Sequence, residues 1–170
     1  MTPPRFFNRW VLFAVVVGAI ATGMDHDYYY TLLNFIGIHT LLVVGLNLLL
    51  GYAGQISLGH AAFFGLGAYT SGILTATGGV DPWLALMAGL AVSGLAAFLI
   101  GIPALKLRGY YLAMATLGFG IIVYIILNEA SDLTGGPSGL SGIPSLSLAG
   151  FAFNTPRRLY LLIWIILGLI

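Results

Sequence analysis

The sequence contains no cysteine and very few charged residues. Without cysteine it can form no disulfide, no thiol nucleophile and no cysteine-ligated zinc site. Charged residues make up 6% of the chain, whereas soluble domains contain about 25%. A formal net charge of +1 gives no basis for nucleic-acid binding. These absences leave a chain whose chemistry rests on neutral groups.

Motifs that support catalysis or proton coupling are absent from the sequence as well. It has no zinc-binding histidine pair and no G-x-S-x-G nucleophile elbow. Its long apolar runs contain no Asp, Glu, Lys or Arg, the buried charges on which many proton-coupled carriers depend. The Asp25-His26-Asp27 turn fits a solvated loop better than a metal site. We therefore expect neither an enzyme nor a proton pump, and no cofactor or metal.

Apolar residues dominate what is present, at 59% of the 170 residues with a mean hydropathy of +1.03. We expect an all-α integral membrane protein, a polytopic helical bundle forming a single transmembrane domain. About five full spans and a truncated sixth are predicted, with an external loop over 128–158; the spans are 10–24, 31–50, 57–77, 83–105, 110–127 and the incomplete 159–170. A cleaved signal peptide at the N-terminus is possible, but a retained first helix is favoured.

The last apolar run, 159–170, is too short to cross a bilayer. As a helix it rises about 18 Å, against a hydrocarbon core of about 30 Å. We therefore expect the sequence to be the N-terminal part of a longer protein.

Residues 51–72, GYAGQISLGHAAFFGLGAYTSG, combine many glycines with polar groups between two apolar runs. Each glycine costs a helix roughly 1 kcal/mol relative to alanine, so Gly51 and Gly54 predict a helix break near 51–57. Polar groups at membrane depth face protein or a water-filled path. Gln55, Ser57 and His60 are thus candidates for lining or bracing a translocation path, and hydrogen bonds between packed helices are the alternative.

Small residues recur at steps of three and four in two of the predicted spans. Such stripes let membrane helices approach closely, although generic packing explains most of this signal. The first stripe follows Ser57 and contains Ala61, Gly65, Ala68 and Gly72. The second contains Ala85, Gly89, Ser93, Ala97 and Gly101. We expect these spans to pack against each other or against another helix.

The distribution of Lys and Arg in short loops predicts the orientation. A cytoplasmic N-terminus places Lys106 and Arg108 at the cytoplasmic face, together with Arg5 and Arg9, and places the carboxylates outside. Arg157 and Arg158 go against the rule. Lys106 and Arg108 are therefore expected to fix the topology, with contact to a cytosolic ATPase as a further possibility.

Three blocks of the sequence resemble one family of membrane proteins. These blocks are NLLLGYAGQISLGHAAFFGLGAYTSG at 47–72, GIPALKLRGYYLAMATLG at 101–118 and LTGGPSGLSGIP at 133–144. They are similar to the LivM-type permeases, membrane subunits of branched-chain amino acid ABC importers in the bacterial inner membrane. The resemblance implies a related partner permease, two cytosolic ATPase subunits that hydrolyse ATP and an external solute-binding protein.

Two positions depart from the pattern of that family. After Gly118-Phe119-Gly120 the family commonly has a glutamate and, three residues later, an arginine, whereas this sequence has Ile121 and Tyr124.

The resemblance implies half of a heterodimeric pore for branched-chain or other small amino acids. Alternatives are an ABC permease for urea or short amides, an ion-coupled secondary carrier, and a membrane scaffold that transports nothing.

Overall fold

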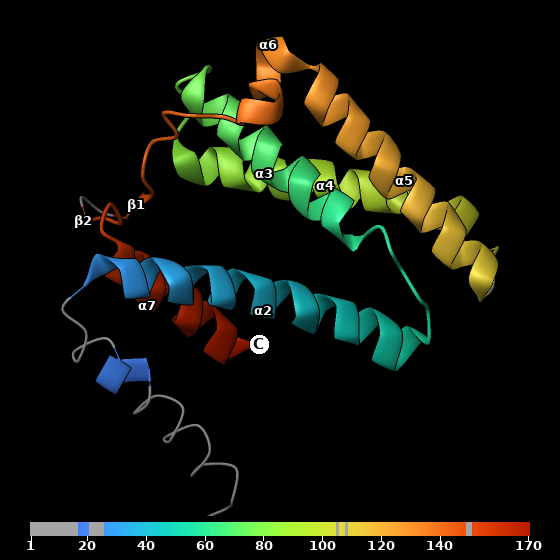
Figure 1. Ribbon diagram of the computed structural model, residues 1–170, viewed down its shortest axis with the longest axis horizontal. Coiled ribbons are helices and arrows are strands. Elements are labelled where there is room, and N and C mark those ends of the chain that lie inside the picture. Colours follow the sequence, from blue (N-terminus) through green and yellow to red (C-terminus); the bar gives the residue numbers. More distant parts are fainter. Residues whose placement is uncertain (1–16, 21–25, 105, 108, 149–150) are drawn as a thin grey trace, which may run out of the picture. The chain divides into compact units, whose positions relative to one another are not determined.

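The computed structural model describes residues 17–20, 26–104, 106–107, 109–148 and 151–170, and most of them are helical. The long helices are α2 (Asp27–Ala53), α3 (His60–Ala76), α4 (Pro82–Ala104), α5 (Tyr110–Glu129) and α7 (Pro156–Leu169) (Figure 1). Between α5 and α7 lie the single turns α6 (Ser131–Thr134) and η1 (Gly136–Ser138) and two paired two-residue strands, β1 (Ser147–Leu148) and β2 (Phe151–Ala152). The predicted all-α class is confirmed.

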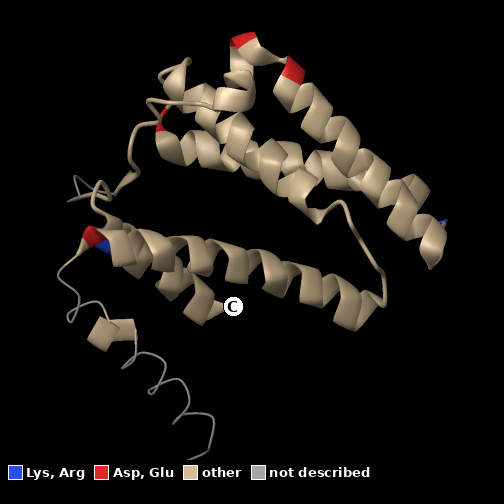
Figure 2. Cartoon of the chain, viewed as in Figure 1, with Lys and Arg blue, Asp and Glu red and all other residues tan. Residues whose placement is uncertain are grey.

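Three of the described helices, α2, α4 and α5, are long and apolar enough to cross a membrane. Helix α3 has only 17 residues and α7 only 14. Most of the expected first span, 10–24, lies outside the described residues. The described residues thus contain three helices of spanning length, and the predicted number of about five full spans is not confirmed. Charged residues of the described helices lie at or near their ends, so the helix middles present only neutral groups (Figure 2).

The chain divides into two compact units, which are described separately. The first consists of residues 1–43 and 149–170. In it the fully buried Tyr160 of α7 packs edge-to-face on Tyr30 of α2, with ring centres 5.8 Å apart. A Cβ added to Gly37 would lie 2.6 Å from Ile163 Cγ2, so α7 fits against α2 only because this position has no side chain. Asn34, buried as expected for a polar group in a span, donates to the Pro156 carbonyl at 3.0 Å.

The second unit, residues 44–148, is built around α3. Helix α4 lies along one side of α3, where a Cβ on Gly89 would come within 2.7 Å of the Gly67 carbonyl oxygen. The Ser93 hydroxyl on α4 donates to the Phe63 carbonyl on α3 at 2.9 Å. Helix α5 packs on another side of α3 and is linked to α4 by a short turn. Close backbone approach and one interhelical hydrogen bond thus hold the α3–α4 pair together.

The connection after α5 folds back over the α3 and α4 ends and is called here the strap, residues 134–147. The Thr134 hydroxyl donates to the Leu127 and Ala130 carbonyls and accepts from Gly136 N–H, which fixes the start of the strap. Leu140 and Ile143 then pack over Gly72, with side-chain carbons 3.3 and 3.4 Å from where its Cβ would be. The Trp83 indole N–H donates to the Ser147 carbonyl at the other end. The expected external loop is thus an ordered cover over this unit.

Candidate functional site

The helix break predicted at 51–57 lies at 54–59 in the structure. Helix α2 continues through Gly51 to Ala53, because one glycine near the end of a 27-residue apolar helix does not outweigh the hydrogen bonds around it. Gly54 then takes a positive φ of 61°, a conformation that glycine adopts at no steric cost. Residues 54–59 are not helical, and α3 begins at His60. Gly51, expected in the break, is therefore part of α2.

The second half of the break is attached to α5. Leu58 N–H donates to the Thr116 hydroxyl at 3.0 Å. A Cβ on the buried Gly59 would lie 2.5 Å from the Thr116 carbonyl oxygen, and a Cβ on Gly120 would lie 3.7 Å from Gly59 Cα. Two glycines therefore let the backbone of the break lie directly on the backbone of α5.

The three polar candidates are close in sequence but differ in position. Gln55 and Ser57 lie in the break, so Ser57 precedes the helical stripe that was expected to follow from it. His60 is the first residue of α3, and its imidazole lies 3.4 Å from where a Cβ on Gly45 would be. All three side chains are half-buried, and none makes a hydrogen bond within the part of the chain that the structure describes. They are polar groups at a helix break whose hydrogen-bonding capacity is still available.

The two stripes of small residues pack in different ways. On α4, Gly89 is buried against α3, Ser93 bonds to α3 and Ala85 is fully buried. Ala97 is exposed, and a Cβ added to Gly101 would have nothing within 4 Å. On α3, Gly65 lies against Leu127 of α5 and Gly72 lies under the strap. Ala61 faces the groove described below, and Ala68 lines the hollow beside α4.

The residues of α3 that meet α4 most closely were not predicted from the sequence. They are Phe63, Gly67 and Ser71, where Gly67 is the closest backbone contact and Phe63 supplies the carbonyl for Ser93. Their spacing of four was visible in the sequence. This second face lies next to the predicted stripe on α3, and because Phe63 is large the face does not read as a stripe of small residues.

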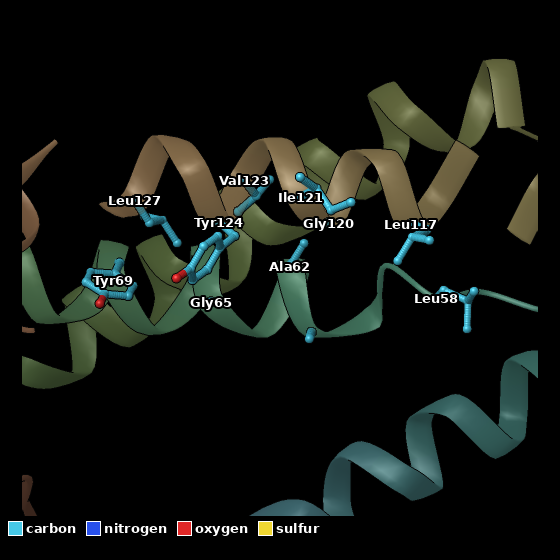
Figure 3. Close-up of a pocket in the computed structure, with 11 residues that line it drawn as sticks. Leu58, Ala62, Gly65, Tyr69, Leu117, Gly120, Ile121, Val123, Tyr124 and Leu127 are labelled. Atoms are coloured by element: carbon cyan, nitrogen blue, oxygen red, sulfur yellow. The ribbon is translucent and has the colours of Figure 1, made fainter. Parts of the chain in front are cut away.

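A groove of about 390 Å³ runs between α3 and α5 and begins at the break. Figure 3 shows its two walls, with Tyr69 and Tyr124 coming from opposite helices at one end and Leu58 and Leu117 at the other. The side chains that line it are neutral, and apart from the two phenols they are apolar; the lining is Leu58, Ala61, Ala62, Gly65, Tyr69, Leu117, Gly120, Ile121, Val123, Tyr124 and Leu127. Neither phenol hydroxyl makes a hydrogen bond within the described residues.

Comparison with known proteins identifies the family. The family model described as "Branched-chain amino acid transport system / permease component" matches residues 28–170. The chain belongs to this permease family. It is 46% identical over 122 residues to the high-affinity branched-chain amino acid transport system permease protein LivM of Salmonella typhimurium, and 42% identical over 121 residues to LivM of Escherichia coli. Each match covers 71% of this chain and 28% of the relative, and no solved structure matches.

Membership of the permease family confirms the predicted LivM-type resemblance and places the chain among multi-pass proteins of the bacterial inner membrane. The neutral helix middles are consistent with that environment, because a charge at the bilayer centre is costly. The two positions that depart from the expected family pattern, Ile121 and Tyr124, both line the α3–α5 groove. In this chain the α5 wall of the groove is therefore apolar apart from the Tyr124 phenol.

The basic turn between α4 and α5 is only partly described. Lys106 lies in it with an exposed side chain, and Arg108 lies outside the described residues. The exposure of Lys106 is compatible with a role in topology.

Proposed function

We propose that the intact protein is the membrane subunit of an ATP-driven importer for branched-chain or other small amino acids. The observation that carries the proposal is the match of residues 28–170 to the permease family, supported by the identity to two LivM proteins. The intact subunit forms half of a heterodimeric pore with a related permease. Two cytosolic ATPase subunits drive the pore, and an external solute-binding protein delivers the amino acid.

The break at 54–59 supplies the site along the path. Six consecutive residues lie outside any helix; the N–H groups of Gly54, Gln55 and Leu58 are bonded within the chain, whereas those of Ile56, Ser57 and Gly59 make no hydrogen bond among the described residues. Irregular backbone at membrane depth is tolerated where it lines a cavity. Gln55, Ser57 and His60 add polar side chains with free hydrogen-bonding capacity. Discontinuous helices bind solutes in secondary transporters by the same physics. In this proposal the break binds the polar end of the amino acid.

The aliphatic lining of the α3–α5 groove favours an amino acid with an apolar side chain over urea or a short amide. Its walls include Leu58, Leu117, Ile121 and Val123. Burial of an aliphatic side chain against such walls is favourable at roughly 25 cal/mol per Å², and urea has no such surface. In the proposed orientation the N-terminus is cytoplasmic, and Lys106 and Arg108 therefore lie at the cytoplasmic face.

Uptake by cells tests the proposal. The gene encoding the full-length protein is disrupted and then restored, and uptake of radiolabelled leucine is measured in both strains with excess unlabelled isoleucine, valine, urea or acetamide. The proposal predicts loss and recovery of uptake, with competition by isoleucine and valine only. Unchanged leucine uptake in the disrupted strain contradicts the proposal, and loss of radiolabelled urea uptake in that strain would indicate the amide permease.

A further inference from the structure

We propose that Thr116 is a positioning residue that fixes the second half of the break to α5, so that the break moves with α5 and hinges at Gly54. The inference rests on the proposed function, because it concerns the segment assigned there to the path. It assigns a mechanical role to a residue of α5 that does not itself contact the solute.

The hydroxyl of Thr116 both accepts and donates a hydrogen bond. The side chain is buried, with 7% of its surface exposed. Its Oγ1 accepts from Leu58 N–H at 3.0 Å and donates to the Ala113 carbonyl at 3.0 Å. Leu58 lies in the break, so its N–H has no helical partner, and an unpaired N–H inside a membrane protein is costly. Thr116 supplies the acceptor for that group and is itself held in place by its own helix.

Backbone contact on both sides of this hydrogen bond adds to the attachment. Gly59 lies so close to the Thr116 carbonyl that any side chain at this position would collide with it. Gly120, one turn further along α5, brings its own backbone against Leu58 and Gly59. We therefore expect Leu58 and Gly59 to move together with α5 as one rigid body.

The first half of the break has no comparable attachment. Gly54 has nothing within 4 Å of where a Cβ would be, and the side chains of Gln55 and Ser57 make no hydrogen bond within the described residues. Only the backbone bonds from Gly54 and Gln55 to the carbonyls of Leu50 and Leu49 tie this end to α2. A hinge at 54–57 next to an anchor at 58–59 is the resulting arrangement.

The arrangement has a consequence for transport. A path that alternates between two states needs contacts that differ between them. If α5, the anchor at 58–59 and the start of α3 move as one body, the anchor keeps its position relative to the groove, while the hinge that carries Gln55 and Ser57 bends and the access to these two side chains changes. Loss of the Thr116 hydroxyl would free the break from α5, and Ser57 would become more accessible.

The experiment uses the full-length protein in its assembled importer and compares T116V, which removes the hydroxyl, with T116S, which keeps it. T70V is the matched control, because the Thr70 hydroxyl bonds only to Leu66 of its own helix. These 170 residues contain no cysteine, so S57C is a single reporter once any cysteines elsewhere in the importer have been replaced, and its rate of maleimide labelling is measured in each variant. Leucine uptake is measured in the same variants without the reporter.

The proposal predicts that T116V speeds labelling of S57C about fivefold or more, the factor that matches loss of one hydrogen bond. It also predicts that T116V lowers the maximal rate of uptake more than it changes KM, while T116S and T70V behave as wild type in both measurements. If T116V does not accumulate in the membrane, G59A replaces it: this variant keeps the Thr116 hydroxyl, but its Cβ would lie 2.5 Å from the Thr116 carbonyl oxygen and must separate the break from α5, so it must speed labelling too.

Two results overturn the inference. One is labelling in T116V, or in its replacement G59A, that equals the T70V rate, and the other is labelling in T116S as fast as in T116V. The labelling measurement needs no transport, so the two proposals fail separately. Leucine uptake with unchanged labelling rejects the role of Thr116 alone. Faster labelling in a protein that takes up no amino acid rejects the importer and leaves the anchor standing.

Discussion

Single residues decide how closely the helices of the second unit approach each other. At Gly67 and Gly89 the backbones of α3 and α4 touch, and the Ser93 hydroxyl bridges the same pair. In lipid there is no hydrophobic driving force between helices, so van der Waals contact and interhelical hydrogen bonds supply most of the association energy. The contact is therefore sensitive to one added methyl group.

Replacement of Gly89 by valine tests this contact. A Cβ at this position meets the Gly67 carbonyl at 2.7 Å, so α3 and α4 must separate. Overpacking of this kind costs about 1 to 3 kcal/mol, and we expect a lower melting temperature of the detergent-solubilised importer. The matched control is G94A on the same helix, where nothing lies within 4 Å and no loss is expected. A melting temperature for G89V equal to that of G94A contradicts the assigned contact.

The sequence indicated the small residues that contact a neighbouring helix more completely for α4 than for α3. The spacing of Ala85, Gly89 and Ser93 indicated which α4 residues are small and aligned; Gly89 and Ser93 meet α3, and Ala85 is fully buried. On α3 two small-residue faces exist, and periodicity alone does not say which neighbour each one meets. Gly65 and Gly72 face α5 and the strap, whereas Gly67, which was not singled out, meets α4.

At the scale of elements, the helix break was predictable in kind but not in exact place. Glycine content indicated a break close to residue 54, but the end of α2 depends on which glycine takes a positive φ, and that is Gly54 rather than Gly51. The attachment of the break to Thr116 joins residues 58 positions apart in the sequence. No local pattern carries such information, so the anchor emerges only from the fold.

The strap depends on one buried hydroxyl, and its loss has a defined expected effect. Thr134 has 2% of its surface exposed and makes three hydrogen bonds through Oγ1. T134V leaves the Gly136 N–H without its acceptor, at a cost of about 1 to 3 kcal/mol. We expect faster proteolysis within 134–147 in the intact importer.

The control for the strap is T77V, because the exposed Thr77 hydroxyl bonds only to the Ile73 carbonyl of its own helix. Proteolysis of T77V should match wild type. Equal protection of the strap in T134V and T77V would show that Thr134 does not hold it.

At the scale of the whole molecule, the membrane class followed from composition, whereas the number of spans did not. Hydropathy and the lack of charge indicated helices in a bilayer, and α2, α4 and α5 fulfil this. Helix α3 begins three residues later than expected because the anchored break takes up residues 57–59, and it is left with 17 residues. Composition cannot show how a break divides an apolar run.

The proposed orientation makes a prediction that labelling can check. With the N-terminus in the cytoplasm, Lys106 lies at the inner face and the strap at the outer face. A membrane-impermeant maleimide added to intact cells should therefore label S138C in η1 and not K106C. Both sites should react after permeabilisation, which serves as the control. Labelling of K106C in intact cells would invert the proposed topology.

ATP-driven uptake by the purified full-length importer in liposomes tests the central claim most directly. With the solute-binding protein and radiolabelled leucine outside, and ATP on the side of the ATPase subunits, the account predicts accumulation of leucine that stops when a non-hydrolysable ATP analogue replaces ATP. It predicts no accumulation from an imposed proton or sodium gradient without ATP. Accumulation that follows the gradient and ignores ATP would contradict the account and identify an ion-coupled carrier.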